Sequence, residues 1–179
     1  MARPVRNAHP CEALSSARIF FATTKTSLGR GLFQSERNAQ LFIDVLRRNV
    51  SEHRFKVHDF VVMPDHVHLL LEVNGDMTVE KAMQLIKGGF SYRVKKECGY
   101  LGEVWQRGFS EERANDERSI LRFREYIAQN PLKAGLVTGA ETYPFSFAHL
   151  AQQKRIRAKE PANERVTPDG VDPTATRRG

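Results

Sequence analysis

The sequence has few cysteines and no long apolar run, and both absences restrict the kind of protein it encodes. Only Cys11 and Cys98 occur among its 179 residues, too few for a disulfide scaffold or a cysteine-ligated zinc cluster. No apolar run approaches the ~18 residues of a membrane-spanning helix. Met1 to Ala13 contain no apolar stretch of the secretory-signal type. We therefore expect a cytoplasmic protein with reduced thiols and no membrane segment.

Positive charge is in excess. The chain has 28 Lys and Arg against 21 Asp and Glu, a formal net charge of +7 at pH 7. Such a surplus favours nucleic acids or anionic surfaces as partners, although a solvated basic surface without a dedicated partner has the same composition. No glycine-rich phosphate-binding loop is present to indicate a reaction that consumes ATP.

The first half of the chain has the hydrophobic periodicity of strands and one helix. Residues 18–24 are aromatic and β-branched, which predicts a strand. Apolar positions at helical spacing from residue 39 onward predict an amphipathic helix that runs to about Glu52. Residues 60–63 and 66–73 predict two strands, which the turn residues between them would join as an antiparallel hairpin.

The second half predicts two more helices and a strand. A helix opens at Thr78 and has an apolar stripe that extends to Phe90. Residues 104–110 predict the next strand. A third helix contains residues 120–127 and should end near Asn130, because the proline that follows disfavours helical geometry in the residue before it.

The order β-α-β-β-α-β followed by a helix predicts an α+β fold, a ferredoxin-like sandwich with an antiparallel central sheet. We expect three regions in the chain: an N-terminal extension over 1–17, one folded domain over 18–150, and a basic tail over 151–179. The composition of residues 158–179, rich in charge and proline, predicts disorder in that part of the tail.

A His-x-His pair lies on the second strand of the hairpin. Alternate residues of a strand face the same side, so His66 and His68 project together while Val67 points into the core. Two imidazoles side by side are half of a site for a divalent transition metal; the alternative is one core histidine and one surface histidine. The next same-face position is Leu70, which argues against a histidine-triad hydrolase. The pair fits a catalytic ion that also takes oxygen from a substrate.

A tyrosine and an asparagine share one face of the third helix. Tyr126 and Asn130 are spaced i, i+4. The amide of Asn130 is a candidate third metal ligand, with Gln129 as the alternative, and either would place the phenol beside the ion. A free phenol titrates near pH ~10, so attack at neutral pH needs a nearby cation or base. The other reading is a tyrosine packed at a helix edge and an asparagine that ends the helix.

Three segments resemble, in order, blocks of the HUH single-tyrosine transposases. These are residues 60–70, which include the histidine pair, residues 104–109, and residues 126–137, which include the tyrosine. The similarity is greatest to the REP-associated tyrosine transposases and covers residues 19–150. It implies a ferredoxin-like fold with the histidines on a central strand and the tyrosine on a following helix.

The resemblance also implies a mechanism. His66, His68 and Asn130 would hold Mg²⁺ or Mn²⁺, and Tyr126 would attack a phosphate of single-stranded DNA at a hairpin. The products would be a 5′-phosphotyrosine link and a free 3′-hydroxyl, and a later attack on the link would rejoin the strand. Because Mg²⁺ prefers oxygen ligands, two imidazoles favour Mn²⁺ at least as strongly. We expect a monomer rather than the homodimer of mobile insertion-sequence relatives.

Basic residues on the second helix and after it are candidate DNA contacts. Lys87, Arg93 and Lys95 are interleaved with aromatic residues such as Phe90, and Arg107 lies in the following segment. Bases of a single strand stack on aromatic rings while basic groups follow the phosphates. The alternative is ordinary amphipathic packing, with the phenylalanine in the core and the basic groups in solvent.

Two other functions compete with the transposase. One is a DNA-binding protein that keeps the fold and no longer performs strand transfer, against which the intact Tyr126 and histidine pair argue. The other is a metallohydrolase unrelated to DNA, against which the missing third strand histidine and the basic surplus argue.

Overall fold

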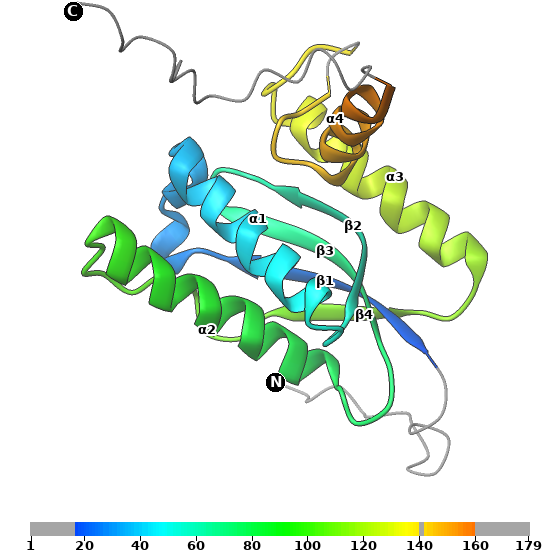
Figure 1. Cartoon of the computed structure of the whole chain (residues 1–179), viewed down its shortest axis with the longest axis horizontal. Coiled ribbons are helices and arrows are strands. Elements are labelled where there is room, and N and C mark those ends of the chain that lie inside the picture. The colour runs from blue at the N-terminus through cyan, green and yellow to red at the C-terminus, as the bar shows by residue number, and fades with distance from the viewer. Residues whose placement is uncertain (1–16, 140–141, 160–179) are drawn as a thin grey trace, which may run out of the picture.

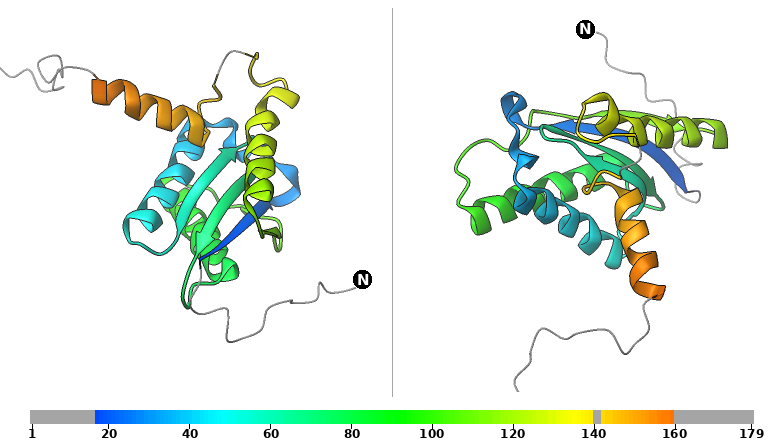
Figure 2. Two further views of the ribbon diagram at one scale, coloured as in Figure 1. Left: turned by 90° about the vertical axis from the view of Figure 1, so that its right-hand side faces the viewer. Right: turned by 90° about the horizontal axis from the view of Figure 1, so that it is seen from above.

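The computed structural model describes residues 17–139 and 142–159, in which a four-stranded sheet is covered by helices on both faces (Figures 1 and 2). The strands are β1 (Arg18–Lys25), β2 (Lys56–Val62), β3 (His66–Val73) and β4 (Ser110–Ala114). The helices are α1 (Glu36–Ser51), α2 (Val79–Cys98), α3 (Glu117–Lys133) and α4 (Phe147–Lys159). Two 3-10 turns, Ser27–Gly29 and Leu32–Gln34, join β1 to α1. Except for Ala17, the predicted N-terminal extension lies outside the described residues.

The sheet has the ferredoxin-like order β2-β3-β1-β4, and all neighbouring strands are antiparallel. The predicted hairpin is present, because β2 pairs with β3 directly across the turn at residues 63–65. The order β-α-β-β-α-β with a following helix is therefore confirmed, and the histidine strand β3 is central.

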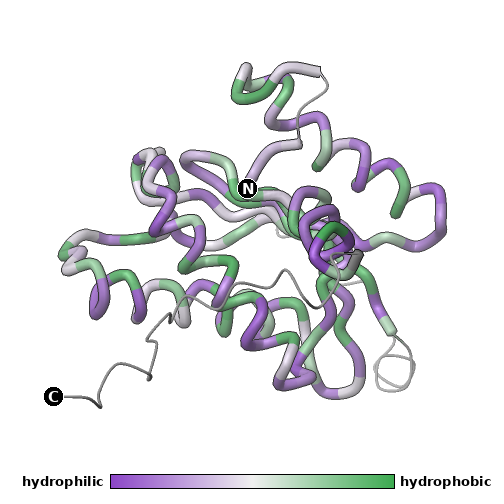
Figure 3. The backbone as a smooth tube through the Cα atoms, turned by 45° about the horizontal axis from the view of Figure 1, so that its top comes forward, coloured by the Kyte–Doolittle hydropathy of each residue, from purple (hydrophilic) through white to green (hydrophobic). Residues whose placement is uncertain are grey.

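The two faces of the sheet bury different sets of side chains. Val67, Leu69 and Leu71 of β3 belong to the main core beneath α1 and α2, which also contains a cluster of aromatic rings. The alternate residue Leu70 belongs to a second, smaller core beneath α3, on the same face as the histidines. Figure 2 shows α3 on one side of the sheet and α1 and α2 on the other. Along the helices, hydrophobic positions are interspersed among hydrophilic ones (Figure 3).

The expected strand over residues 104–110 is wrong: β4 begins only at Ser110. Trp105 makes a single bridge to Thr26, is nearly buried in the main core, and donates its indole N–H to the carbonyl of Lys87 at 3.0 Å. Val104 is buried in the same core. These residues are apolar because they close the core between two helices. The edge strand β4 consists largely of exposed polar side chains, so its sequence lacks the apolar pattern that would predict a strand.

The expected end of the third helix near Asn130 is also wrong. Helix α3 continues to Lys133 with Pro131 inside it. The proline lacks the N–H that would bond the carbonyl four residues earlier, but its ring is buried. Burial of the ring offsets the lost hydrogen bond over the last turn, so the helix passes through the proline.

The predicted tail is wrong over its first residues. Residues 151–159 belong to helix α4, which packs on β2, where Phe147 meets the ring of Phe60 edge-on at 6.2 Å. The composition of this segment does not predict a helix, because few of its residues are apolar. Residues 160–179 lie outside the described part of the chain. None of the helices in the described part combines the length and apolar character that a membrane crossing requires.

Candidate active site

The two histidines occupy the start of β3. Strand alternation turns both rings toward α3, and their centroids are 4.8 Å apart. The turn just before the strand supplies Asp65, whose Oδ1 atom is 2.6 Å from Nδ1 of His66. This contact leaves Nε2 of the half-buried His66 ring available to a ligand.

The second ring, His68, is held more rigidly. It is 4% exposed, it stacks on Phe21 at 5.5 Å, and its Nδ1 lies 2.8 Å from the hydroxyl of Thr23 on β1. The pKa of His68 is lowered to about 4, mainly by burial and also by the charge of His66, while the side chain of Asn130 acts in the opposite direction. The imidazole is therefore neutral at pH 7, which is the form that binds a metal.

Helix α3 brings the tyrosine to this pair. Its apolar residues pack on the sheet, where Phe123 stacks on Phe21 at 4.7 Å. Tyr126, one turn further on, meets the ring of His68 edge-on at 5.2 Å. The phenol ring is 45% exposed, so a substrate can reach it from solvent. The structure thus places the predicted nucleophile beside the predicted metal ligands.

The next turn of α3 distinguishes the two candidate amide ligands. The side chain of Asn130 lies close enough to His68 to influence its pKa, and its Nδ2 donates to the carbonyl of Tyr126 at 2.7 Å. The side-chain amide of Gln129 instead donates to Glu125 at 2.9 Å, on the solvent side of the helix. The amide that lies at the histidine pair is therefore that of Asn130.

These side chains fit a divalent transition metal. Both Nδ1 atoms contact an oxygen of a neighbouring residue, as the ring nitrogen that does not bind the ion usually does in metal-bound histidines. The nearby amide offers a neutral oxygen. In the described residues, no group of three or more His, Cys, Asp or Glu side chains is placed to share one ion. Two imidazoles and one amide leave positions open for substrate oxygens, as a catalytic ion needs.

Sequence reasoning missed several residues that surround this set. Thr23 and Lys25 come from β1, Asp65 precedes the histidine pair, and Nζ of Lys133 lies 5.9 Å above the ring of Tyr126. The acid next to His66 and the i+7 spacing of the lysine are visible in the sequence. The two residues of β1 become neighbours of the site only through the register of β1 on β3.

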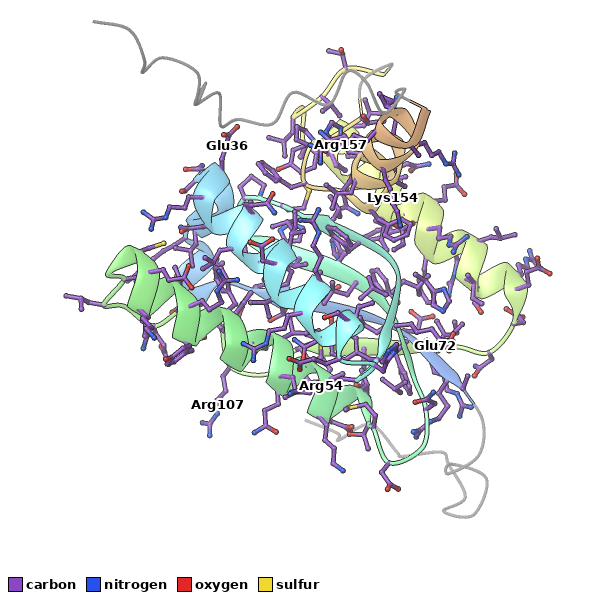
Figure 4. The ribbon with its side chains drawn as sticks, viewed as in Figure 1. Glu36, Arg54, Glu72, Arg107, Lys154 and Arg157 are labelled. Carbon is purple, nitrogen blue, oxygen red and sulfur yellow. The ribbon has the colours of Figure 1, made fainter. Side chains whose placement is uncertain are left out.

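The predicted DNA contacts lie on the other face of the sheet. Nζ of Lys87 donates to the carbonyl of Gln106 at 3.1 Å and also contacts the carbonyl of Gly108, so it holds that loop. Arg93 is paired with Glu97 on α2. Figure 4 shows Arg107 pointing away from the molecule on this side. Lys95 is also exposed on α2. The structure therefore does not bring these four residues to the histidines and the tyrosine.

A separate hollow of about 630 Å³ lies between α1, β2 and α4. Ile43 and Leu46 of α1 line it, together with Lys154 and Arg157 of α4, which are labelled in Figure 4. None of the residues predicted for catalysis or metal binding lines it.

A family model described as "Transposase IS200 like" matches residues 22–130, which contain the histidine pair, the tyrosine and Asn130. A REP-associated tyrosine transposase of Escherichia coli is 30% identical over 96 residues, which are 53% of this chain and 55% of the relative. A Haemophilus influenzae protein, provisionally named a REP-associated tyrosine transposase, is 25% identical over 118 residues, 60% of this chain and 67% of that protein. The chain thus spans about half of the Escherichia coli relative.

A solved structure extends the likeness to the whole fold. It is that of a REP-associated tyrosine transposase bound to a REP hairpin, and it superimposes with a TM-score of 0.67. The match covers 99% of this chain and 98% of that one at 22% identity. At this identity the likeness shows a shared fold.

Proposed function

Because the chain belongs to the IS200-like transposase family, we propose that it is a metal-dependent single-strand DNA endonuclease and strand-transferase that acts at DNA hairpins. The proposed nucleophile is Tyr126, and the proposed ligands of Mg²⁺ or Mn²⁺ are His66, His68 and Asn130. The observation that carries the proposal is the 5.2 Å contact between the rings of Tyr126 and His68, which come from different elements.

The proposed reaction is two successive transesterifications. The Oη atom of Tyr126 attacks a backbone phosphorus, the bond from phosphorus to the 3′-oxygen breaks, and that oxygen leaves as a hydroxyl after taking up a proton. The phenolic proton passes to solvent. A 5′-phosphotyrosine link remains until a 3′-hydroxyl attacks it and releases the tyrosine. When bound, the ion would neutralise charge on the phosphoryl oxygens.

Each described side chain has a part in this scheme. His66 and His68 present their Nε2 atoms because Asp65 and Thr23 engage the other ring nitrogens. Helix α3 orients the tyrosine, and its 45% exposed ring leaves the phenol open to an incoming strand. The hairpin as target is supported by the solved relative, which is bound to a REP hairpin.

The test uses single-stranded oligonucleotides copied from hairpins that flank the gene, with Mn²⁺, Mg²⁺ or a chelator. Denaturing electrophoresis should show a protein–DNA adduct that needs the metal and disappears in Tyr126→Phe. His66→Ala should lose the adduct and also lose Mn²⁺ binding, measured by calorimetry without DNA. Tyr100→Phe is the matched control, because this tyrosine packs against the main core on the other face and should leave the adduct unchanged.

Other outcomes separate the rival functions. Cleavage that survives Tyr126→Phe would mean that water attacks, and the protein would be a hydrolase. Hairpin binding without an adduct under either metal, for the full set of flanking hairpins, would identify a DNA-binding protein that has lost transfer.

A further inference from the structure

Lys25 ends strand β1 next to the proposed active site. In the register of β1 on β3, it lies opposite His66, just as Thr23 lies opposite His68. Alternate residues of a strand share a face, and the hydroxyl of Thr23 contacts the ring of His68. The side chain of Lys25 therefore projects on the same face as both histidines and toward α3.

The backbone around Lys25 is fixed while its ammonium is not engaged. Its carbonyl accepts from the N–H of Gln106 at 2.9 Å, and the N–H of Thr26 donates to the carbonyl of Asp65 at 2.8 Å. Its side chain is exposed, and no ion pair joins it to a carboxylate in residues 17–139 and 142–159. Asp65, the acid that precedes the histidine pair, is already bonded to His66.

Another lysine on this face of the sheet has an acidic partner. Lys56 is paired with Glu72 at 2.7 Å. Lys25 instead lies opposite His66 in the strand register, two residues from Thr23, whose hydroxyl contacts the ring of His68. If the two imidazoles hold a divalent ion, that ion repels the unpaired ammonium of Lys25. The two positive charges are favourable together only when an anion binds between the ammonium and the metal ion.

We propose that Lys25 binds the phosphodiester that Tyr126 attacks, with its ammonium donating to a non-bridging oxygen. This inference rests on the proposed function. The ammonium keeps its proton throughout and makes no covalent bond, so the bonds that break and form remain those of the tyrosine reaction. Its part is electrostatic: it holds the phosphate against the nucleophile and stabilises the negative charge on the phosphoryl oxygens in the transition state.

The test compares Lys25→Gln with wild type in single-turnover cleavage at saturating DNA and Mn²⁺. We expect the rate constant to fall by ~100-fold, as for the loss of one preorganised donor, with Mn²⁺ affinity in the absence of DNA not reduced. Lys25→Cys should be equally slow, and alkylation with 2-bromoethylamine, which rebuilds an ammonium at that position, should restore most of the rate. Wild-type protein treated in the same way controls for Cys11 and Cys98.

A binding measurement addresses the phosphate contact without requiring cleavage. The slope of log affinity for single-stranded DNA against log salt should fall by ~0.7 in Lys25→Gln, the amount expected for one lost phosphate contact. Lys81→Gln removes the same charge from α2 on the other face, where its Nζ donates to the carbonyl of Asp76. This control should leave both the slope and the rate unchanged.

Three results would overturn the assignment. They are a wild-type cleavage rate in Lys25→Gln, a slow rate that rises to the wild-type value when Mn²⁺ is raised above the concentration that saturates wild type, or an unchanged salt slope. If wild-type protein forms no adduct at all, the proposed function fails, and the salt slope still decides whether Lys25 contacts a phosphate.

Discussion

Each histidine of the pair is fixed through the ring nitrogen that a metal would not use. His66 has Asp65 as its partner at 2.6 Å, and His68 has Thr23 at 2.8 Å. Such partners set the ring orientation and the tautomer, and their loss commonly weakens metal binding. Asp65 is half-exposed and lies in a turn, whereas Thr23 lies in a rigid strand. Removal of the contact between Thr23 and His68 should therefore disturb the rest of the structure less.

Thr23→Val should therefore lower Mn²⁺ affinity by ~10–100-fold, because the valine keeps the shape of the side chain and removes only the hydroxyl. Calorimetric titration of the protein with Mn²⁺ measures the change. An unchanged affinity would mean that the ring of His68 is oriented by packing on Phe21 alone.

Thr24→Val is the matched control, because the next residue of the strand points to the opposite face. The hydroxyl of Thr24 is buried and has no hydrogen-bond partner in the described part of the chain. Replacing it should raise the free energy of unfolding by ~1 kcal/mol and leave Mn²⁺ affinity as in wild type. Urea denaturation gives the first quantity.

Asp59 lies on the same face of the sheet, and partial burial makes the charged form of its carboxyl less stable. Asp59 of β2 is half-buried next to a register shift. Burial raises the pKa of Asp59 from 3.8 to about 6, with a hydrogen bond from the N–H of Phe60 and the charge of Arg124 opposing the shift. The folded state therefore holds this proton more tightly than the unfolded state between pH 3.8 and about 6, and stability falls as the pH rises through that window.

Asp59→Asn should raise the melting temperature at pH 8 and have little effect near pH 3, where the wild-type carboxyl is largely protonated in both the folded and the unfolded state. The asparagine keeps an oxygen that can accept from Phe60. Calorimetric scans at the two pH values test the prediction, and an equal gain at both would show that titration of this group is not the cause.

At the scale of elements, α3 decides whether the site is assembled, because it carries both Tyr126 and Asn130. Its first turn is closed by a capping box in which Oδ1 of Asp116 accepts from the N–H of Ser119 at 2.7 Å. Hydrogen bonds from Ser119 lower the pKa of Asp116. The cap thus contributes stability above pH 3.8, the ordinary value for Asp, and loses it as the pH falls through the lowered pKa.

Asp116→Ala should lower the melting temperature at pH 7, because unpaired N–H groups are left at the start of α3. Asp116→Asn retains a capping oxygen and should lie close to wild type. Hydrogen exchange of the α3 amides localises the change. Loss of protection confined to the main core, with α3 unaffected, would contradict this role of the cap.

At the scale of the molecule, the sheet separates two surfaces with different uses. The side facing α3 presents the histidines and the tyrosine, and α1 and α2 cover the other side (Figure 2). The net charge of +7 attracts DNA to the molecule as a whole and does not select one side. The position of the site predicts that a short single strand contacts the α3 side.

The double variant Arg93→Gln/Lys95→Gln tests whether DNA also reaches α2. We expect its salt slope for an oligonucleotide with a short single-stranded foot to equal that of wild type. Fluorescence anisotropy at a series of salt concentrations measures the slope. A fall of ~1.4, two lost single-strand contacts, would show that the strand wraps around the sheet, and would support the DNA contacts predicted from the sequence.

Local regularities in the sequence were sufficient for most of the elements, with β4 and α4 as the exceptions. A continuous apolar run and the turn after it identified the histidine hairpin, and period-3.6 patterns identified α1 and α2. Strand alternation placed His66 and His68 on one face. The i, i+4 spacing placed Tyr126 and Asn130 together. These inferences succeed because they depend only on backbone geometry within one element, which the side-chain pattern must match to bury an apolar face.

The tertiary structure decided what depends on contacts between elements. Pairing with β1 makes the polar segment Ser110–Ala114 a strand, and packing makes helices of residues 151–159 and of the turn that contains Pro131. The pairing of β1 with β3 also brings Thr23 and Lys25 to the histidines, whereas the basic residues of α2 lie on the other face. Register and packing set these neighbours, because the favourable contacts lie between residues far apart in the chain and no local pattern records them.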